Sequence, residues 1–210
     1  LRVVVDPMYG AASGYFAELL RRLGCSVKEI HVGPQDDFGG IHPQPADPWA
    51  DECSNVVQEV GADLGILFDG DGDRAAIVDS SGHLLTPHEF VPLMIKHLVA
   101  FRGEMGRVVS TLTCSASISR QAERWGLETV SVPVGFARIY SEIEAGNVLL
   151  AAEEYGGLCF PQHLLERDGL LAGLYMVELA AKSGRSIAEL VAEDTAELGR
   201  MCYMRRGVRL

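Results

Sequence analysis

Short apolar runs alternate along the chain with longer stretches of helical periodicity. Runs such as 3–5, 64–68 and 148–152 are rich in Val, Leu, Ile and Ala, as expected of buried strands. Between them, apolar positions recur every three or four residues, which predicts helices. Strands and helices that alternate in this way are typical of βα units around a largely parallel sheet. We therefore predict an α/β fold rather than a helix bundle or a β-sandwich.

The predicted elements follow one another closely. Two of the helix starts are marked by capping boxes, at Thr86 to Glu89 and at Ser186 to Glu189. Prolines and glycines crowd the segment 33–49, which we expect to be a loop. The predicted strands are 3–5, 26–32, 64–68, 75–78, 83–85, 107–112, 128–132 and 148–152, and the predicted helices are 15–23, 50–60, 87–101, 115–125, 137–144, 168–182 and one that begins after Ser186.

The periodic pattern stops and restarts near residue 103. Residues 102–106 hold two glycines and two charged side chains between two periodic stretches, and both halves begin with a strand, a helix and a strand. The size of each half suits a single domain. We predict two tandem α/β domains, residues 1–103 and residues 104–210.

Composition narrows the class of protein. The chain is 48% hydrophobic and has a formal net charge of −11, so neither a disordered chain nor a general nucleic-acid or membrane-surface binder is expected. No apolar run approaches the ~18 residues of a membrane span, and no signal peptide is recognisable, so we expect a soluble, cytoplasmic protein. The five cysteines are scattered and are expected to be free thiols. The chain opens without Met directly into a strand, which suggests a piece of a longer polypeptide.

The most informative segment is the acidic loop that follows the strand 64–68. Asp69, Asp71 and Asp73 alternate with glycines, which let the backbone curl so that three carboxylates face one point. Carboxylates held this close repel one another, and a hard divalent cation such as Mg²⁺ would relieve the repulsion. Arg74 follows directly and offers a fork of donors suited to phosphate oxygens or to a salt bridge with the aspartates. We predict a magnesium site here.

Other motifs fit this loop poorly. An EF-hand loop that begins at Asp69 needs Gly and Glu where the chain has Arg74 and Ser80. A dinucleotide fingerprint would place aspartates against a pyrophosphate and would be followed by a helix. A Walker A sequence is absent. The DxD motif of a metal-dependent glycosyltransferase remains as an alternative.

The acidic loop and several other stretches resemble the α-D-phosphohexomutase superfamily, the phosphoglucomutases and phosphomannomutases. The sequence DGDGDR at 69–74 is identical to the metal loop of that family, and 5–11, 39–45 and 61–65 resemble other parts of its second domain. Residues 133–136 and 153–157 resemble the two sugar-phosphate loops of its third domain. The resemblance covers essentially the whole chain. It implies two three-layer α/β/α domains with mixed, mainly parallel sheets, the first binding metal and the second binding sugar.

The resemblance also implies a function. Family members move a phosphoryl group between positions 1 and 6 of a hexose through a phosphoserine, with a hexose bisphosphate as activator. Asp69, Asp71 and Asp73 would then hold Mg²⁺ and Arg74 would act in catalysis, since phosphoryl transfer depends on positioning and charge stabilisation. The substrate-binding residues carried over from the family loops are Gly135, Phe136, Arg138, Glu153 and Tyr155. The family's catalytic serine and main phosphate loop belong to its first and fourth domains, which nothing here matches, so we expect the chain alone to be inactive.

Three positions depart from the family pattern. Ala137 stands where many members have Lys, with Arg138 next to it, and the sugar loop has Ala152 and Tyr155 in place of Gly and Ser. Since Tyr is much larger than Ser, we expect altered substrate specificity. A degenerate homologue that binds metal or sugar phosphate without catalysis is the second alternative. His42, His163 and Arg167 lie in predicted loops, where solvent-facing or capping roles are favoured over phosphate contact.

Overall fold

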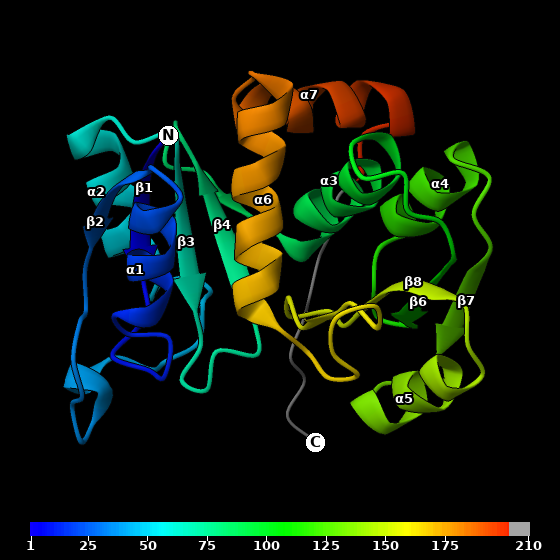
Figure 1. The fold of residues 1–210 in the computed structure, drawn as a ribbon, viewed down its shortest axis with the longest axis horizontal. Helices are drawn as coiled ribbons and strands as arrows, with labels where there is room; N and C mark the ends of the chain where they lie inside the picture. Colours follow the sequence, from blue (N-terminus) through cyan, green and yellow to red (C-terminus); the bar gives the residue numbers. More distant parts are fainter. Residues whose placement is uncertain (202–210) are drawn as a thin grey trace.

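The computed structural model describes residues 1–201 and contains two sheets with helices on their faces (Figure 1). The strands are β1 (Arg2–Asp6), β2 (Ser26–Glu29), β3 (Leu64–Phe68), β4 (Ala75–Asp79), β5 (Leu84–Leu85), β6 (Arg107–Thr111), β7 (Thr129–Val132), β8 (Val148–Ala152) and β9 (Leu158–Cys159). The helices are α1 (Tyr15–Arg22), the 3₁₀ turn η1 (Phe38–Gly40), α2 (Asp51–Val60), α3 (Pro87–Ala100), α4 (Ala116–Arg124), α5 (Phe136–Glu144), α6 (Gly169–Ser183) and α7 (Ile187–Leu198).

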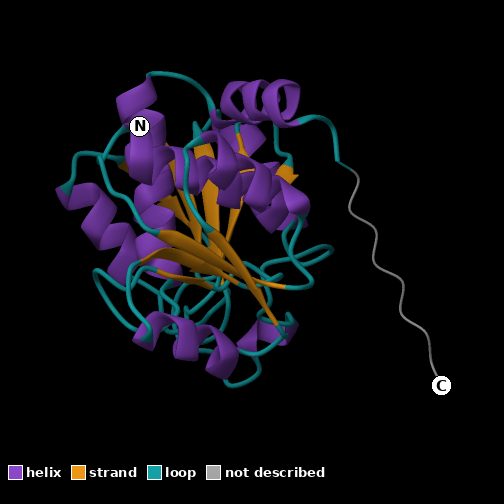
Figure 2. Ribbon diagram, turned by 90° about the vertical axis from the view of Figure 1, so that its right-hand side faces the viewer, coloured by secondary structure: helices purple, strands orange, loops and turns teal. Residues whose placement is uncertain are grey.

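Four strands of each sheet follow the same topology, and the first sheet has β5 as an additional edge strand. The first has the order β2-β1-β3-β4-β5 and the second the order β7-β6-β8-β9. In each sheet the first three strands are parallel and the fourth is antiparallel to the third. Helices flank the strands, as Figure 2 shows. The predicted α/β class with mixed, mainly parallel sheets is confirmed.

Most predicted elements agree with the structure to within a few residues, and both capping boxes are present at Thr86 and Ser186. The second strand is shorter than predicted because the chain turns at His31, whose φ is 48°. The two-residue strand β9 was not predicted. Phe101, the last residue of the predicted helix 87–101, is instead the C-cap of α3 and is 37% exposed.

Local chemistry explains how α3 tolerates a proline in its interior. Pro92 has no N–H to donate to the carbonyl of His88. The hydroxyl of Ser117, on α4, donates to that carbonyl instead at 2.8 Å. The amide of Gln121, also on α4, donates to the carbonyl of Pro92 at 3.3 Å. The proline therefore ties α3 to α4 rather than breaking the helix.

The third helix of each half packs with the other half. Helix α6 follows the second sheet in sequence but lies against β3 and β4 of the first, while α3 follows the first sheet and packs on α4 (Figure 1). A Cβ atom at Gly173 of α6 would lie 3.0 Å from Phe16 and 3.1 Å from Ile66, so this position has no room for a larger side chain. The packing thus crosses the expected division at residue 103.

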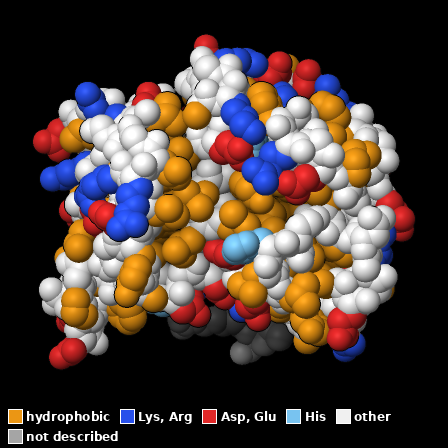
Figure 3. All heavy atoms as spheres, viewed as in Figure 1, with side chains coloured by type: hydrophobic (Ala, Val, Ile, Leu, Met, Phe, Trp, Pro, Cys, Tyr) orange, Lys and Arg blue, Asp and Glu red, His pale blue; other side chains and the backbone are white. Residues whose placement is uncertain are grey.

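One hydrophobic core connects the halves as a result. It runs from the face of the first sheet covered by α1 and α6 to the face of the second covered by α3 and α4. Smaller clusters lie under α2 and under α5. Where α6 meets α3, acidic and basic side chains gather on the surface (Figure 3), among them Arg102, Glu178 and Lys182.

Two further findings bear on the class of protein. None of the helices within residues 1–201 combines the length and apolar character that a membrane crossing requires. Cys25, Cys53, Cys114 and Cys159 are free thiols, and Cys202 lies outside the described residues.

Candidate functional site

The predicted site residues meet where parallel strands of both sheets end. The acidic loop follows β3, Thr111 ends β6, and the predicted sugar loop 153–157 follows β8. Ligand sites of α/β proteins commonly lie at this edge of the sheet. A cavity of about 390 Å³ lies there between the halves, lined by Asp69, Asp71, Asp73, Arg74, Thr111, Thr113, Val134, Glu153, Glu154, Tyr155 and Arg167.

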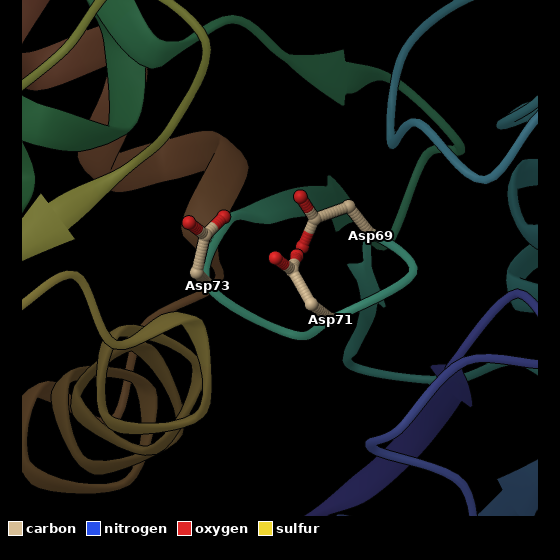
Figure 4. Close-up of side chains that lie close together, drawn as sticks. All are labelled: Asp69, Asp71 and Asp73. Carbon is tan, nitrogen blue, oxygen red and sulfur yellow. The ribbon is translucent and has the colours of Figure 1, made fainter. Parts of the chain in front are cut away.

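The three aspartates of the acidic loop converge (Figure 4). One carboxylate oxygen from each of Asp69, Asp71 and Asp73 lies within 4.8 Å of the others. Gly72, with a φ of 81°, takes the left-handed conformation that the tight loop requires. At such separations each pair of charges repels by about 3 kcal/mol at an effective dielectric constant of 20, so a cation among the three carboxylates would stabilise the loop.

Asp69 is held in place by the loop itself. The residue is 1% exposed, and its carboxylate accepts hydrogen bonds from the backbone N–H groups of Gly72, at 3.1 Å, and Arg74, at 3.0 Å. The Nε of Arg74 donates to its other oxygen at 2.5 Å. Asp71, by contrast, is exposed. The loop therefore combines one fixed carboxylate with one that is free to reach a ligand.

Asp73 is the carboxylate most disturbed by its surroundings. Burial and the neighbouring charge of Asp69 raise its pKa to about 6, although the cation of Arg167 opposes the shift. The Nη2 of Arg167 lies 2.7 Å from Oδ2 of Asp73, and the Nε of Arg74 lies 3.7 Å from Oδ1. Asp73 thus faces the other two aspartates on one side and the guanidinium groups of Arg74 and Arg167 on the other.

The predicted sugar loop lies directly against the acidic loop. Gly157 forms a β-bridge with Arg74, and the N–H of Ala75 donates to the carbonyl of Gly156 at 3.3 Å. Gly156 has a φ of 84°, and a Cβ there would come within 2.5 Å of the carbonyl oxygen of Ala75. The approach of the two loops thus depends on glycine at this position.

The structure brings most of the sequence-predicted residues to one cavity. Glu153 and Tyr155 line it together with the aspartates and Arg74, and Tyr155 also lines a smaller neighbouring cavity of about 160 Å³. Phe136 contacts the guanidinium of Arg167, a lining residue of the cavity, at 5.2 Å from the ring centroid. Gly135 is the residue before α5, and Arg138 is exposed on that helix and does not line the cavity.

Several lining residues were missed from the sequence. Thr111 and Thr113 were not predicted, whereas Val134 belongs to the loop 133–136 that the resemblance assigned to sugar phosphate. The place of the two threonines at the end of the predicted strand 107–112 was the available signal. Arg167, for which a solvent-facing or capping role was favoured, instead pairs with Asp73 and Glu153. No local pattern could show this, because its partners are remote in sequence.

The charge balance of the cavity indicates what it can bind. Five carboxylates line it but only two guanidinium groups, those of Arg74 and Arg167. A phosphate group would be repelled unless further positive charge were present. Oxygen donors from a rigid loop suit a hard divalent cation, which would supply that charge.

Comparisons with known proteins give a consistent result. Residues 1–82 match the family model described as phosphoglucomutase/phosphomannomutase, alpha/beta/alpha domain II, and residues 86–198 match that of domain III. The two models meet just before α3. A phosphoglucomutase/phosphomannomutase of Thermococcus kodakarensis is 32% identical over 191 residues, which are 91% of this chain and 42% of the relative.

Two further relatives extend the comparison. A phosphoglucosamine mutase of Exiguobacterium sp. is 29% identical over 203 residues, covering 92% of this chain and 42% of its own length. The crystal structure of a phosphoglucomutase/phosphomannomutase family protein from Burkholderia thailandensis superimposes with a TM-score of 0.84 at 25% identity, over 92% of this chain and 42% of that one. The chain therefore spans less than half the length of these relatives.

Proposed function

The chain belongs to the phosphoglucomutase/phosphomannomutase family, and from this we propose that it supplies the metal-binding and sugar-binding parts of a phosphohexomutase. Its relatives are phosphohexomutases, which are isomerases. The proposed reaction moves a phosphoryl group between positions 1 and 6 of a hexose. The observation that carries the proposal is that the aspartate triad and Glu153 face one cavity from opposite halves of the chain.

The residues of the acidic loop fit a magnesium ion. Three carboxylate oxygens within 4.8 Å of one another offer the hard ligands that Mg²⁺ prefers. We assign Asp69, Asp71 and Asp73 as its ligands. Bound there, Mg²⁺ would supply positive charge beside the phosphoserine and the transferring phosphoryl group.

Arg74 has the proposed catalytic role. Its Nε is fixed by Asp69, so the side chain is oriented by a buried carboxylate while its head lines the cavity. A guanidinium held in this way can stabilise charge that develops on phosphoryl oxygens without reorganising during transfer. In this proposal, the ion pair of Asp69 with Arg74 orients the catalytic guanidinium as well as stabilising the loop.

The second half provides the proposed sugar contacts. Glu153 is the candidate acceptor for sugar hydroxyls, and Tyr155 lies beside it in the same cavity wall. Gly135, Phe136 and Arg138 remain proposed substrate contacts. Of these, Phe136 is linked to the cavity through Arg167, whereas Arg138 would reach a substrate only from the exposed side of α5.

The nucleophile is proposed to lie outside this chain. The chain spans less than half of its relatives, so a phosphoserine and a further phosphate-binding loop would come from the remaining domains of a longer polypeptide. The proposed partners are a hexose phosphate substrate and a hexose bisphosphate activator. The 210 residues alone are then expected to lack mutase activity.

The experiment that tests this function uses the complete polypeptide that carries this chain. It is incubated with radiolabelled glucose 1,6-bisphosphate with and without Mg²⁺, and the modified residue is identified. The expected result is Mg²⁺-dependent labelling of a serine outside these 210 residues, with loss of turnover in R74Q. The exposed Arg22 gives a matched control, since R22Q should retain full activity.

The same experiment separates the alternatives. A polypeptide that binds Mg²⁺ but neither becomes labelled nor interconverts glucose 1-phosphate, mannose 1-phosphate or glucosamine 1-phosphate would be the degenerate homologue. The family matches argue against the DxD glycosyltransferase, because both halves match phosphohexomutase domains.

A further inference from the structure

Arg167, just before α6, connects two loops of the cavity and the first residue of α5. Its Nη2 lies 2.7 Å from Oδ2 of Asp73 on the metal loop, and its Nη1 lies 3.1 Å from Oε2 of Glu153 on the sugar loop. Its guanidinium also lies over the ring of Phe136, the first residue of α5. Because the guanidinium is planar and rigid, its two ends fix the relative positions of the two carboxylates.

This arrangement differs from an ordinary surface ion pair. Exposed pairs contribute little because solvent screens them and the side chains remain mobile. Here the side chains of Asp73, Glu153 and Arg167 are 20%, 18% and 29% exposed, and aromatic packing restrains the cation. Within the part of the chain that the structure describes, Arg167 is the cation paired with Glu153, and it is the nearer of two cations to Asp73.

Arg167 therefore pairs with two cavity-lining carboxylates that have different proposed tasks, while its Nε also lies 3.4 Å from the exposed Glu166. A divalent cation at the triad would neutralise part of the negative charge of Asp73, which would weaken the ion pair between Asp73 and Arg167. Arg167 can then pair more strongly with Glu153. Conversely, a substitution that removes the charge of Glu153 would leave Arg167 to pair with Asp73 alone and so to oppose the metal. Such an effect is reciprocal by thermodynamic necessity.

We propose that Arg167 is a positioning residue that links metal binding at Asp73 to the placement of Glu153. The inference rests on the proposed function, because it takes the aspartate triad as the metal site. It adds a dependence that the proposed function does not require: the sugar loop would reach its final geometry only when metal is bound.

The test is a double-mutant cycle on metal affinity in the 210-residue chain. Mg²⁺ binding is measured by calorimetry, and Mn²⁺ binding by electron paramagnetic resonance, for wild type, E153Q, R167Q and the double variant. We expect E153Q to weaken metal binding by about threefold or more in the wild-type background and by clearly less in R167Q, as coupled neighbours behave. Equal effects of E153Q in both backgrounds would show through-space charge alone and would overturn the proposal.

A second readout follows the sugar loop directly. Amide hydrogen exchange in residues 153–157 should slow when metal is added to the wild-type chain and should not change in R167Q, although R167Q still binds metal. R167K keeps the charge but lacks the fork, so it should retain less than half of the coupling. Full coupling in R167K, or slowing in R167Q equal to that of wild type, would contradict a role for the guanidinium.

The outcomes also separate this proposal from the proposed function. A wild-type chain that binds no divalent cation would contradict both. Metal binding that is unaffected by the Arg167 and Glu153 substitutions would contradict the linkage alone. The urea midpoint of each variant, measured without metal, shows whether it is folded.

Discussion

Nε2 of His97, on α3, lies 2.8 Å from Oε2 of Glu178, on α6. The His97 side chain is fully buried, and within residues 1–201 its Nδ1 has no hydrogen-bond partner. Protonation of Nδ1 would bury an N–H without an acceptor, and burial accordingly lowers the pKa of His97. A neutral histidine that donates from Nε2 thus joins the two helices that pack with opposite halves of the chain.

Removal of this junction should destabilise the whole chain. Glu178 also pairs with Arg102 and Lys182, so E178Q should lower the free energy of unfolding by about 1–2 kcal/mol, measured by urea unfolding at pH 7. The exposed Glu18–Arg22 pair provides the control, since E18Q should cost less than about 0.5 kcal/mol. Equal losses in both variants would contradict a special role for the junction.

Glu178 should also make the stability of the chain depend on pH in the acid range. Burial acts to raise the pKa of Glu178, but hydrogen bonds from Lys182, His97 and Arg102 outweigh it and hold the pKa at about 2. A carboxyl whose pKa is depressed stabilises the fold above its unfolded pKa and loses that contribution as the pH falls toward its folded pKa. The difference in unfolding free energy between wild type and E178Q should therefore shrink between about pH 4.5 and pH 2.

The contact of α6 with the first sheet predicts that size at position 173 is critical. G173L would drive a side chain into Phe16, Ile66 and Phe68, and such overpacking typically costs about 1–3 kcal/mol. Ala181, on the same helix, is exposed, so A181L should leave the stability nearly unchanged. Thermal unfolding of both variants checks this. For the same reason, residues 1–103 expressed alone should not unfold cooperatively, because α6 is missing from their core.

Asp69 and Asp71 should differ in what they contribute. D69N removes charge from a buried acceptor of three hydrogen bonds and should lower the stability of the metal-free chain by about 1–3 kcal/mol. D71N removes an exposed charge from a repelling cluster, so it should leave that stability unchanged or raise it. Both should weaken Mg²⁺ binding at least tenfold by calorimetry. Unchanged Mg²⁺ affinity in D71N would contradict the proposed ligand set.

Asp73 should make the metal-free chain less stable as the pH rises. Its pKa is raised to about 6, first by burial and then by Asp69, so the folded chain binds a proton that the unfolded chain has already released. A raised pKa contributes stability below the unfolded value, near pH 3.8, that is lost as the pH rises through about 6. D73N should thus become the more stable protein above pH 6, by about 1 kcal/mol in urea unfolding. A difference that does not vary with pH would contradict this.

Tyr155 should influence which hexose phosphate is used. It stands in the cavity wall next to Glu153 and is much larger than the serine of related loops. In the complete polypeptide, Y155S should change the ratio of kcat/KM for glucose 1-phosphate and mannose 1-phosphate by about fivefold or more, since pocket changes of this size shift selectivity by ~1–3 kcal/mol. Equal ratios in both proteins, with ordinary rates on both substrates, would exclude a role in specificity.

Much of the fold could be predicted because its causes are local. The strand 64–68 and the capping boxes at Thr86 and Ser186 depend on side chains close together in sequence, and the structure contains all three. The shortened strand at His31 and the extra strand β9 depend on loop geometry instead. Convergence of Asp69, Asp71 and Asp73 could also be predicted, since one short loop holds them all.

The sequence by itself determined the α/β class, the acidic loop and the order of the elements, because hydrophobic period, turn residues and alternating charge are encoded within a few residues of each other. Only the tertiary structure decided that α3 and α6 pack with opposite halves and that Arg167 lies between Asp73 and Glu153. These relationships join residues of different loops and helices that no local sequence pattern connects. They arise because apolar helix faces bury against whichever sheet is uncovered, and because a partly buried cation settles where carboxylates from different loops meet.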